Sequence, residues 1–248
     1  MTSVPTLDWM VPARDSSAPS LRLADSVIAQ LSNAIVEGRL KPGDRLPSEA
    51  QIALSFGVSK PVAREALREL AALGVIQVHH GKATRVGEIS VGILARFYRF
   101  AIGSTADGLR QAVELRRILE PQLAKLAAER RTPDDSETLR ALIAQMDAAR
   151  GDVPRWIEAD LAFHNAIAVA THNRLLILQM SGLRDVFRGI LEKFNSRKAR
   201  TPADWRATFN RHVLICDAIV RGDSSDSVDA MTAHFEAAEA AIAELFPT

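Results

Sequence analysis

Hydrophobic positions recur at helical spacing along almost the whole chain beyond residue 20. In residues 22–38 they fall three or four apart, which predicts an amphipathic helix with one buried face. The side chains expected to point inward are Leu23, Val27, Ile28, Leu31, Ile35 and Val36. Residues 89–248 keep this spacing, with breaks near residues 103, 132, 151, 172, 201 and 222. They predict an all-α bundle of about six or seven helices joined by short loops.

Residues 43–86 have a different layout, of two short helices and a hairpin. Ser48 with Gln51 three residues later matches a capping box and opens the first helix, which ends near Gly57. Ser59 caps the second helix, and Pro61 lies in its first turn, where a missing N–H costs nothing. This arrangement is typical of a helix-turn-helix, which places its second helix in the DNA major groove.

The second helix combines a basic face with an apolar face. Lys60, Arg64 and Arg68 recur every four residues, and Ala63, Ala66, Leu67, Leu70 and Ala71 form the packing face. The alternative is an ordinary solvated helix, since charge runs usually face water. The following residues favour DNA binding: a β-like run at 75–78 and a basic, Gly-containing turn at 79–86 predict a wing whose tip reaches the minor groove.

Three runs in this region resemble the GntR family of bacterial transcription regulators: GDRLPSE, GVSKPVAREALRELAALGVI and HHGKATRV. The resemblance implies DNA contacts from the recognition helix, from the wing and from an arginine that contacts the sugar-phosphate backbone of the DNA. The predicted DNA-binding residues are Arg45, Ser48, Ser59, Lys60, Arg64, Arg68, His80, Gly81 and Lys82. Three positions depart from the family pattern. Ala50 replaces an arginine of some members, Lys60 replaces the usual Arg, and Ala83 replaces a wing Gly.

Composition and charge add limits rather than identity. The whole chain carries only +1, but residues 21–88 hold nine Lys/Arg against seven Asp/Glu, so the small basic excess belongs to the first domain. No apolar run is long enough for a transmembrane helix. The single cysteine, Cys216, excludes an intrachain disulfide and fits a reducing cytoplasm; we expect it to be buried.

Four residues of the second domain form a candidate metal site. Asp160 and His164 are four apart on one predicted helix, and His212 and His234 lie on the apolar stripes of two others. A lone inward histidine is more often a hydrogen-bonded core residue. Three histidines and an aspartate pointing inward together suit a divalent cation, because buried polar groups need partners. The ion is expected to be Zn²⁺, with Ni²⁺ or Mn²⁺ as alternatives.

The same region resembles the FCD effector domain of the FadR branch. The resemblance is carried by ELRRILEP at 114–121, by the run from Asp160 to His164, by ATHN at 170–173 and by MTAH at 231–234. In metal-binding members, the positions matching Asp160, His164, His212 and His234 hold the cation. The resemblance therefore implies a small organic or sugar acid as effector rather than an acyl-CoA.

A carboxylate could complete the coordination shell of such a metal. Arg116 is a candidate for binding the other edge of that carboxylate. The alternative role of Arg116 is an ion pair with Glu120 at i+4. Asn165 and Asn173 are further candidates for effector binding, whereas His172 is expected to be a loop residue. Two rivals remain at this point: a metalloenzyme with a DNA-binding appendage, and a purely structural metal.

The sequence thus predicts a mainly α protein with three parts: a disordered tail (1–20), a winged helix-turn-helix (21–88) and a helical metal- and effector-binding domain (89–248). The expected function is that of a cytoplasmic, homodimeric transcription regulator that binds operator DNA as a repressor. The protein is not expected to be an enzyme. A small carboxylate bound at the metal would control its operator affinity, and no membrane would be involved.

Overall fold

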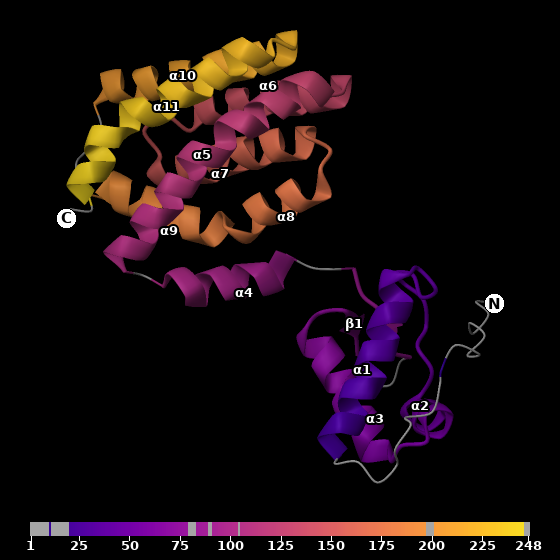
Figure 1. Ribbon diagram of the computed structural model, residues 1–248. Coiled ribbons are helices and arrows are strands. Elements are labelled where there is room, and N and C mark those ends of the chain that lie inside the picture. Colours follow the sequence, from indigo (N-terminus) through magenta and orange to yellow (C-terminus); the bar gives the residue numbers. More distant parts are fainter. Residues whose placement is uncertain are drawn as a thin grey trace. The chain divides into compact units, whose positions relative to one another are not determined.

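The computed structural model describes Met10 and residues 20–78, 83–88, 91–103, 105–196 and 201–245, apart from the side chains of 20–22, 196 and 238–245. The chain divides into two compact units, residues 1–93 and 94–248, each with its own hydrophobic core (Figure 1). None of the described helices is long and apolar enough to cross a membrane.

The first unit is a winged helix-turn-helix. Its elements are α1 (Ser20–Val36), α2 (Glu49–Phe56), α3 (Lys60–Ala72), β1 (Ile76–Gln77) and β2 (Arg85–Val86). The strands pair antiparallel, Ile76 with Val86 and Gln77 with Arg85, which confirms the predicted wing. The wing residues His80, Gly81 and Lys82 lie outside the described residues.

Local sequence explains where these helices begin and end. Ser48 and Gln51 form the predicted capping box at the start of α2, and Gly57 ends that helix in the left-handed conformation with φ of 65°. α3 begins after Ser59, whose side chain makes no capping hydrogen bond. Its apolar face packs on α1 and α2, so its basic face is left exposed.

The core of the first unit follows the predicted phases with one exception. Val27 and Leu31 of α1 are fully buried. Val36, expected to point inward, is 85% exposed, because α1 ends at this residue and the chain turns away through Gly38. Met10 also packs into this core.

Every described element of the second unit is a helix. Its helices are α4 (Val91–Ile102), α5 (Ala106–Arg130), α6 (Pro133–Ala148), α7 (Val153–Ala170), α8 (Arg174–Gly182), α9 (Arg184–Ser196), α10 (Pro202–Arg221) and α11 (Ser224–Leu245). α5 and α7 pack against each other; α7 also packs on α6, α8 and α9, and α5 on α10 and α11 (Figure 1). Thr132 and Thr201 begin α6 and α10 with capping boxes, at two of the predicted breaks between helices. Cys216 is buried, as expected.

The described part of this unit holds one helix more than the upper bound of the prediction, because residues 174–196 form two helices. The chain turns at Leu183, which is fully buried. Gly182 lies so close to α4 that an added Cβ would meet the Leu94 side chain at 2.9 Å. A tertiary contact therefore sets this break, and the apolar spacing along the sequence gives no sign of it.

Candidate DNA-binding surface and metal centre

The exposed face of α3 carries the side chains predicted to contact DNA. Lys60, Arg64 and Arg68 are all exposed, as are Arg45, Ser48 and Ser59. The Ser48 hydroxyl caps α2 by accepting a hydrogen bond from the backbone N–H of Gln51. It is therefore already engaged within the protein. Arg45 lies beside the wing, in a β-bridge with Arg85.

Arg64 has a partner that the sequence pattern did not reveal. Its Nη2 lies 2.9 Å from a Glu49 carboxylate oxygen, and its Nε also donates to that carboxylate. The hydrogen bond from Arg64 lowers the pKa of Glu49. The pair links the starts of α2 and α3 at the protein surface. The spacing of fifteen residues has no helical meaning, so only the packing of α2 on α3 brings these groups together.

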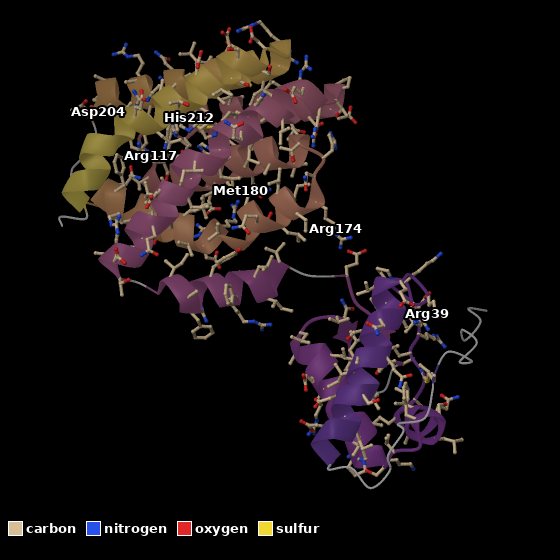
Figure 2. The ribbon with its side chains drawn as sticks, viewed as in Figure 1. Arg39, Arg117, Arg174, Met180, Asp204 and His212 are labelled. Atoms are coloured by element: carbon tan, nitrogen blue, oxygen red, sulfur yellow. The ribbon has the colours of Figure 1, made fainter. Side chains whose placement is uncertain are left out.

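The second unit gathers the three predicted histidines. His164 of α7, His212 of α10 and His234 of α11 each offer a ligand atom, and these atoms lie within 4.8 Å of one another. Nitrogens bound to one metal at about 2.1 Å are at most about 4.2 Å apart, so small side-chain movements suffice to close the site. His212 lies inside the bundle (Figure 2), and His164 is equally buried, whereas His234 is half-buried.

Asp160 joins this group through His212. The Nε2 of His212 lies 3.1 Å from Asp160 Oδ1, and its Nδ1 lies 2.9 Å from the Thr208 carbonyl. A carbonyl oxygen only accepts, so Nδ1 carries the proton, and Nε2 of the neutral ring turns its lone pair toward a carboxylate. Those two groups repel each other unless the ring is charged or a cation lies between them. The donor set therefore fits a divalent metal.

Unpaired atoms around the histidines support the same reading. Asp160 Oδ2, His164 Nε2 and His234 Nδ1 are buried and have no hydrogen-bond partner among the described residues. Such groups are costly unless a ligand satisfies them. Burial, together with the neighbouring histidines, lowers the pKa of His234 well below its ordinary value, so its ring is neutral and able to bind a cation. Burial would raise the pKa of Asp160, but when the His212 ring is protonated and donates to it, this hydrogen bond and the charges of His164 and Arg116 hold that pKa below its usual range.

Glu120, on α5, connects the histidines to Arg116. Its carboxylate contacts Arg116 Nε on one side and His164 Nδ1 on the other, and it is 1% exposed. Burial would raise the pKa of Glu120, but Arg116 and His164 lower it to about 2, so the carboxylate stays charged. The expected alternative partner of Arg116 is thus confirmed. The role of Glu120 toward His164 went unpredicted, because it depends on how α5 packs on α7.

Beside this cluster lies a cavity of about 100 Å³. Arg116, Asp160 and His234 line it, so the candidate clamp and two candidate ligands face the same space. The Arg116 guanidinium stacks against Phe187 and Phe235, 4.7 and 5.3 Å from their ring centres, and its Nη2 is unpaired among the described residues. A cavity of this size suits a small molecule.

The two asparagines proposed as effector ligands do not line this cavity. Asn165 accepts a hydrogen bond from Ser181. Asn173 caps α8, accepting from the amides of Leu175 and Leu176. His172 lies in the turn before α8 and pairs with Asp135, which agrees with its expected place in a loop. Since helix caps and inter-helix hydrogen bonds already use these side chains, the structure lends no support to their role in effector binding.

Comparison with known families now identifies the chain. Residues 23–86 match the bacterial regulatory proteins of the gntR family, and residues 111–237 match the FCD domain. The chain belongs to the GntR family. Members are transcription regulators and not enzymes, so the metalloenzyme alternative falls. The GntR match implies that this regulator binds operator DNA, and the FCD match implies that it binds a small effector.

Individual relatives of this GntR protein support the family assignment. It is 30% identical over 216 residues to the HTH-type transcriptional regulator LutR of Bacillus subtilis, covering 86% of this chain and 97% of LutR. It is 26% identical to the galactonate operon transcriptional repressor of Escherichia coli, covering 82% and 90% of the two chains. Among solved structures, Streptococcus agalactiae GntR has a TM-score of 0.67 at 25% identity, covering 88% of this chain and 99% of that one. These relatives span both units, so the two-part architecture is that of whole regulators.

Proposed function

We propose that this GntR regulator is a metal-dependent repressor whose operator affinity is set by a small organic or sugar acid. The observation that carries the proposal is the shared cavity: Asp160 and His234, two of the four candidate metal ligands, line it together with Arg116. A divalent ion held by one carboxylate and three neutral imidazoles keeps net positive charge and can accept a further carboxylate oxygen. Zn²⁺ suits this donor set, as do Ni²⁺ and Mn²⁺.

The protein's own residues would bind and orient such an acid. Arg116 is fixed by Glu120 and by two aromatic rings, so its remaining N–H groups point in a set direction at little entropic cost. The wall of the cavity is mostly apolar, which strengthens ionic contacts inside it. A galactonate operon repressor among the relatives supports a sugar or hydroxy acid as the effector class.

The DNA-binding part of the proposal rests on the exposed basic face of α3. Lys60, Arg64 and Arg68 would lie in the major groove, with Arg45 and Ser59 at its edge and the wing in the minor groove. Operators of helix-turn-helix proteins are read by dimers, so we expect a homodimer. An effector that binds one state of this dimer more tightly shifts the population toward it, and operator affinity changes accordingly.

Thermal unfolding of the metal-loaded and chelated protein against a panel of small acids tests this function. An effector at 100 times its Kd stabilises the protein by about 2.7 kcal/mol. We expect one acid to raise the melting temperature only when metal is present, and to change operator affinity in a mobility-shift titration. Destabilisation by chelation with no response to any acid would instead indicate a structural metal.

A further inference from the structure

A second arginine lines the effector cavity. Arg211 of α10 precedes the candidate ligand His212, and its Nη2 donates to the Thr208 hydroxyl at 3.1 Å. The Thr208 carbonyl holds His212 in turn. One turn of α10 therefore orients both a metal ligand and a guanidinium that lines the cavity.

The charge of Arg211 is not balanced within the described part of the chain. Arg116 has Glu120, and Asp160 has His212, but no described carboxylate lies within ion-pair distance of Arg211. Its Nε is buried and has no described hydrogen-bond partner.

The surroundings of Arg211 favour an anion from outside the protein. The cavity wall includes Trp156, Leu191 and Phe194, which make it poorly polar. In such an environment a guanidinium without an anionic partner is costly, and a carboxylate bound to it forms a charge-assisted hydrogen bond about twice as strong as a neutral one. A ligand with a single carboxylate would satisfy the metal and Arg116 and leave Arg211 unmatched.

We propose that the ligand of this cavity is a short acid with two anionic groups, such as a dicarboxylate, and that Arg211 binds the second group. The inference rests on the proposed function, which assigns the first carboxylate to the metal and Arg116. It narrows the effector class from small acids in general to acids with two carboxylates.

L-lactate and L-malate are the matched probes, because malate is lactate with a carboxylate in place of one methyl hydrogen. Calorimetric titration of the full-length, metal-loaded protein should give malate at least about tenfold tighter binding than lactate. Arg211→Met should remove this preference while leaving lactate affinity and metal content unchanged. The control is Arg206→Met, an exposed position on the same helix outside the cavity, which should keep the preference. Metal content is measured after each titration, because malate also chelates metals.

The outcomes separate the two proposals. Equal binding of lactate and malate by the unmodified protein overturns the role of Arg211 and leaves the proposed function intact. Equal weakening of both acids by Arg211→Met also overturns it, since a structural role would act on both. If that variant is unstable, Arg211→Lys is the substitute. It keeps the positive charge but cannot donate two parallel hydrogen bonds, so it should reduce the malate preference without abolishing it. Failure of every small acid to bind overturns the proposed function and this inference together.

Discussion

At the residue scale, two functional side chains are each held by a carboxylate from a different helix. Glu49 of α2 holds Arg64, and Glu120 of α5 holds His164. Both partners are carboxylates whose pKa is lowered: that of Glu49 by the hydrogen bond from Arg64, and that of Glu120 by Arg116 and His164 against the effect of burial. Substitutions of Arg64 and of Glu120 test what these two pairs contribute to DNA binding and to metal binding.

Arg64 provides the test of base recognition. If it reads bases, Arg64→Ala should weaken binding to the specific operator by about 1–3 kcal/mol and binding to random duplex far less. Mobility-shift titrations at fixed salt concentration measure both affinities. Arg39→Ala, which removes an exposed arginine paired with Glu37 in the same unit, is the control. An equal loss on both DNAs would make Arg64 a phosphate contact.

Glu120 provides the test of the metal environment. In Glu120→Gln the amide keeps the size of the carboxylate but cannot accept from both Arg116 and His164, so His164 loses its fixed orientation. Outer-shell substitutions of this kind cost about 10- to 100-fold in metal affinity, and we expect a loss in that range for Zn²⁺.

Competition with a coloured chelator measures the Zn²⁺ affinity of this variant. Glu129→Gln, an exposed change on the same helix, should leave it unaltered. Unchanged affinity in a folded Glu120→Gln protein would argue that the carboxylate serves only Arg116.

At the element scale, two serines begin neighbouring helices in different ways. Ser48 accepts a hydrogen bond from the backbone of α2, whereas the Ser59 side chain makes no capping bond to α3. Ser48→Ala should therefore destabilise the first unit by about 1 kcal/mol, and Ser59→Ala by clearly less. Denaturant unfolding of both variants measures the difference. Equal losses would show that the Ser59 side chain caps its helix in solution.

Element packing also decides the break between α8 and α9. Leu183 is buried and Gly182 lies against α4, so the chain turns where helical spacing alone would continue the helix. Helix propensity is a weak preference, and burying the apolar faces of both short helices outweighs it.

At the scale of the whole molecule, the two units have separate cores, and the metal would affect only one of them. Its candidate ligands come from α7, α10 and α11, so removing the ion should leave several buried polar atoms unpaired and loosen this bundle. We expect chelation to lower the melting temperature of the second unit and leave the first unchanged.

Differential scanning calorimetry with and without chelator measures both transitions. An equal shift of the two would indicate that the units unfold together. Insensitivity of both to chelation, in protein shown to contain metal beforehand, would count against the metal site.

The sequence by itself determined the features that depend on local chemistry and periodicity. The capping box at Ser48 predicted the start of α2, the breaks near residues 132 and 201 predicted the starts of α6 and α10, and the alternation of basic and apolar positions predicted the two faces of α3. Helical phase also turned Asp160, His164 and His212 inward, because residues four apart share a face whatever surrounds them. The one misplaced inward side chain, Val36, lies at a helix end, where the phase no longer applies.

Only the tertiary structure decided which of these faces meet. Phase fixes a direction around one helix axis, but a contact also depends on the rotation and distance of the neighbouring helix. The Glu49–Arg64 pair, the contact of Glu120 with His164 and the place of Arg211 in the cavity all depend on such packing. For the same reason, Asn165 and Asn173 lie away from that cavity although their sequence positions suggested effector binding.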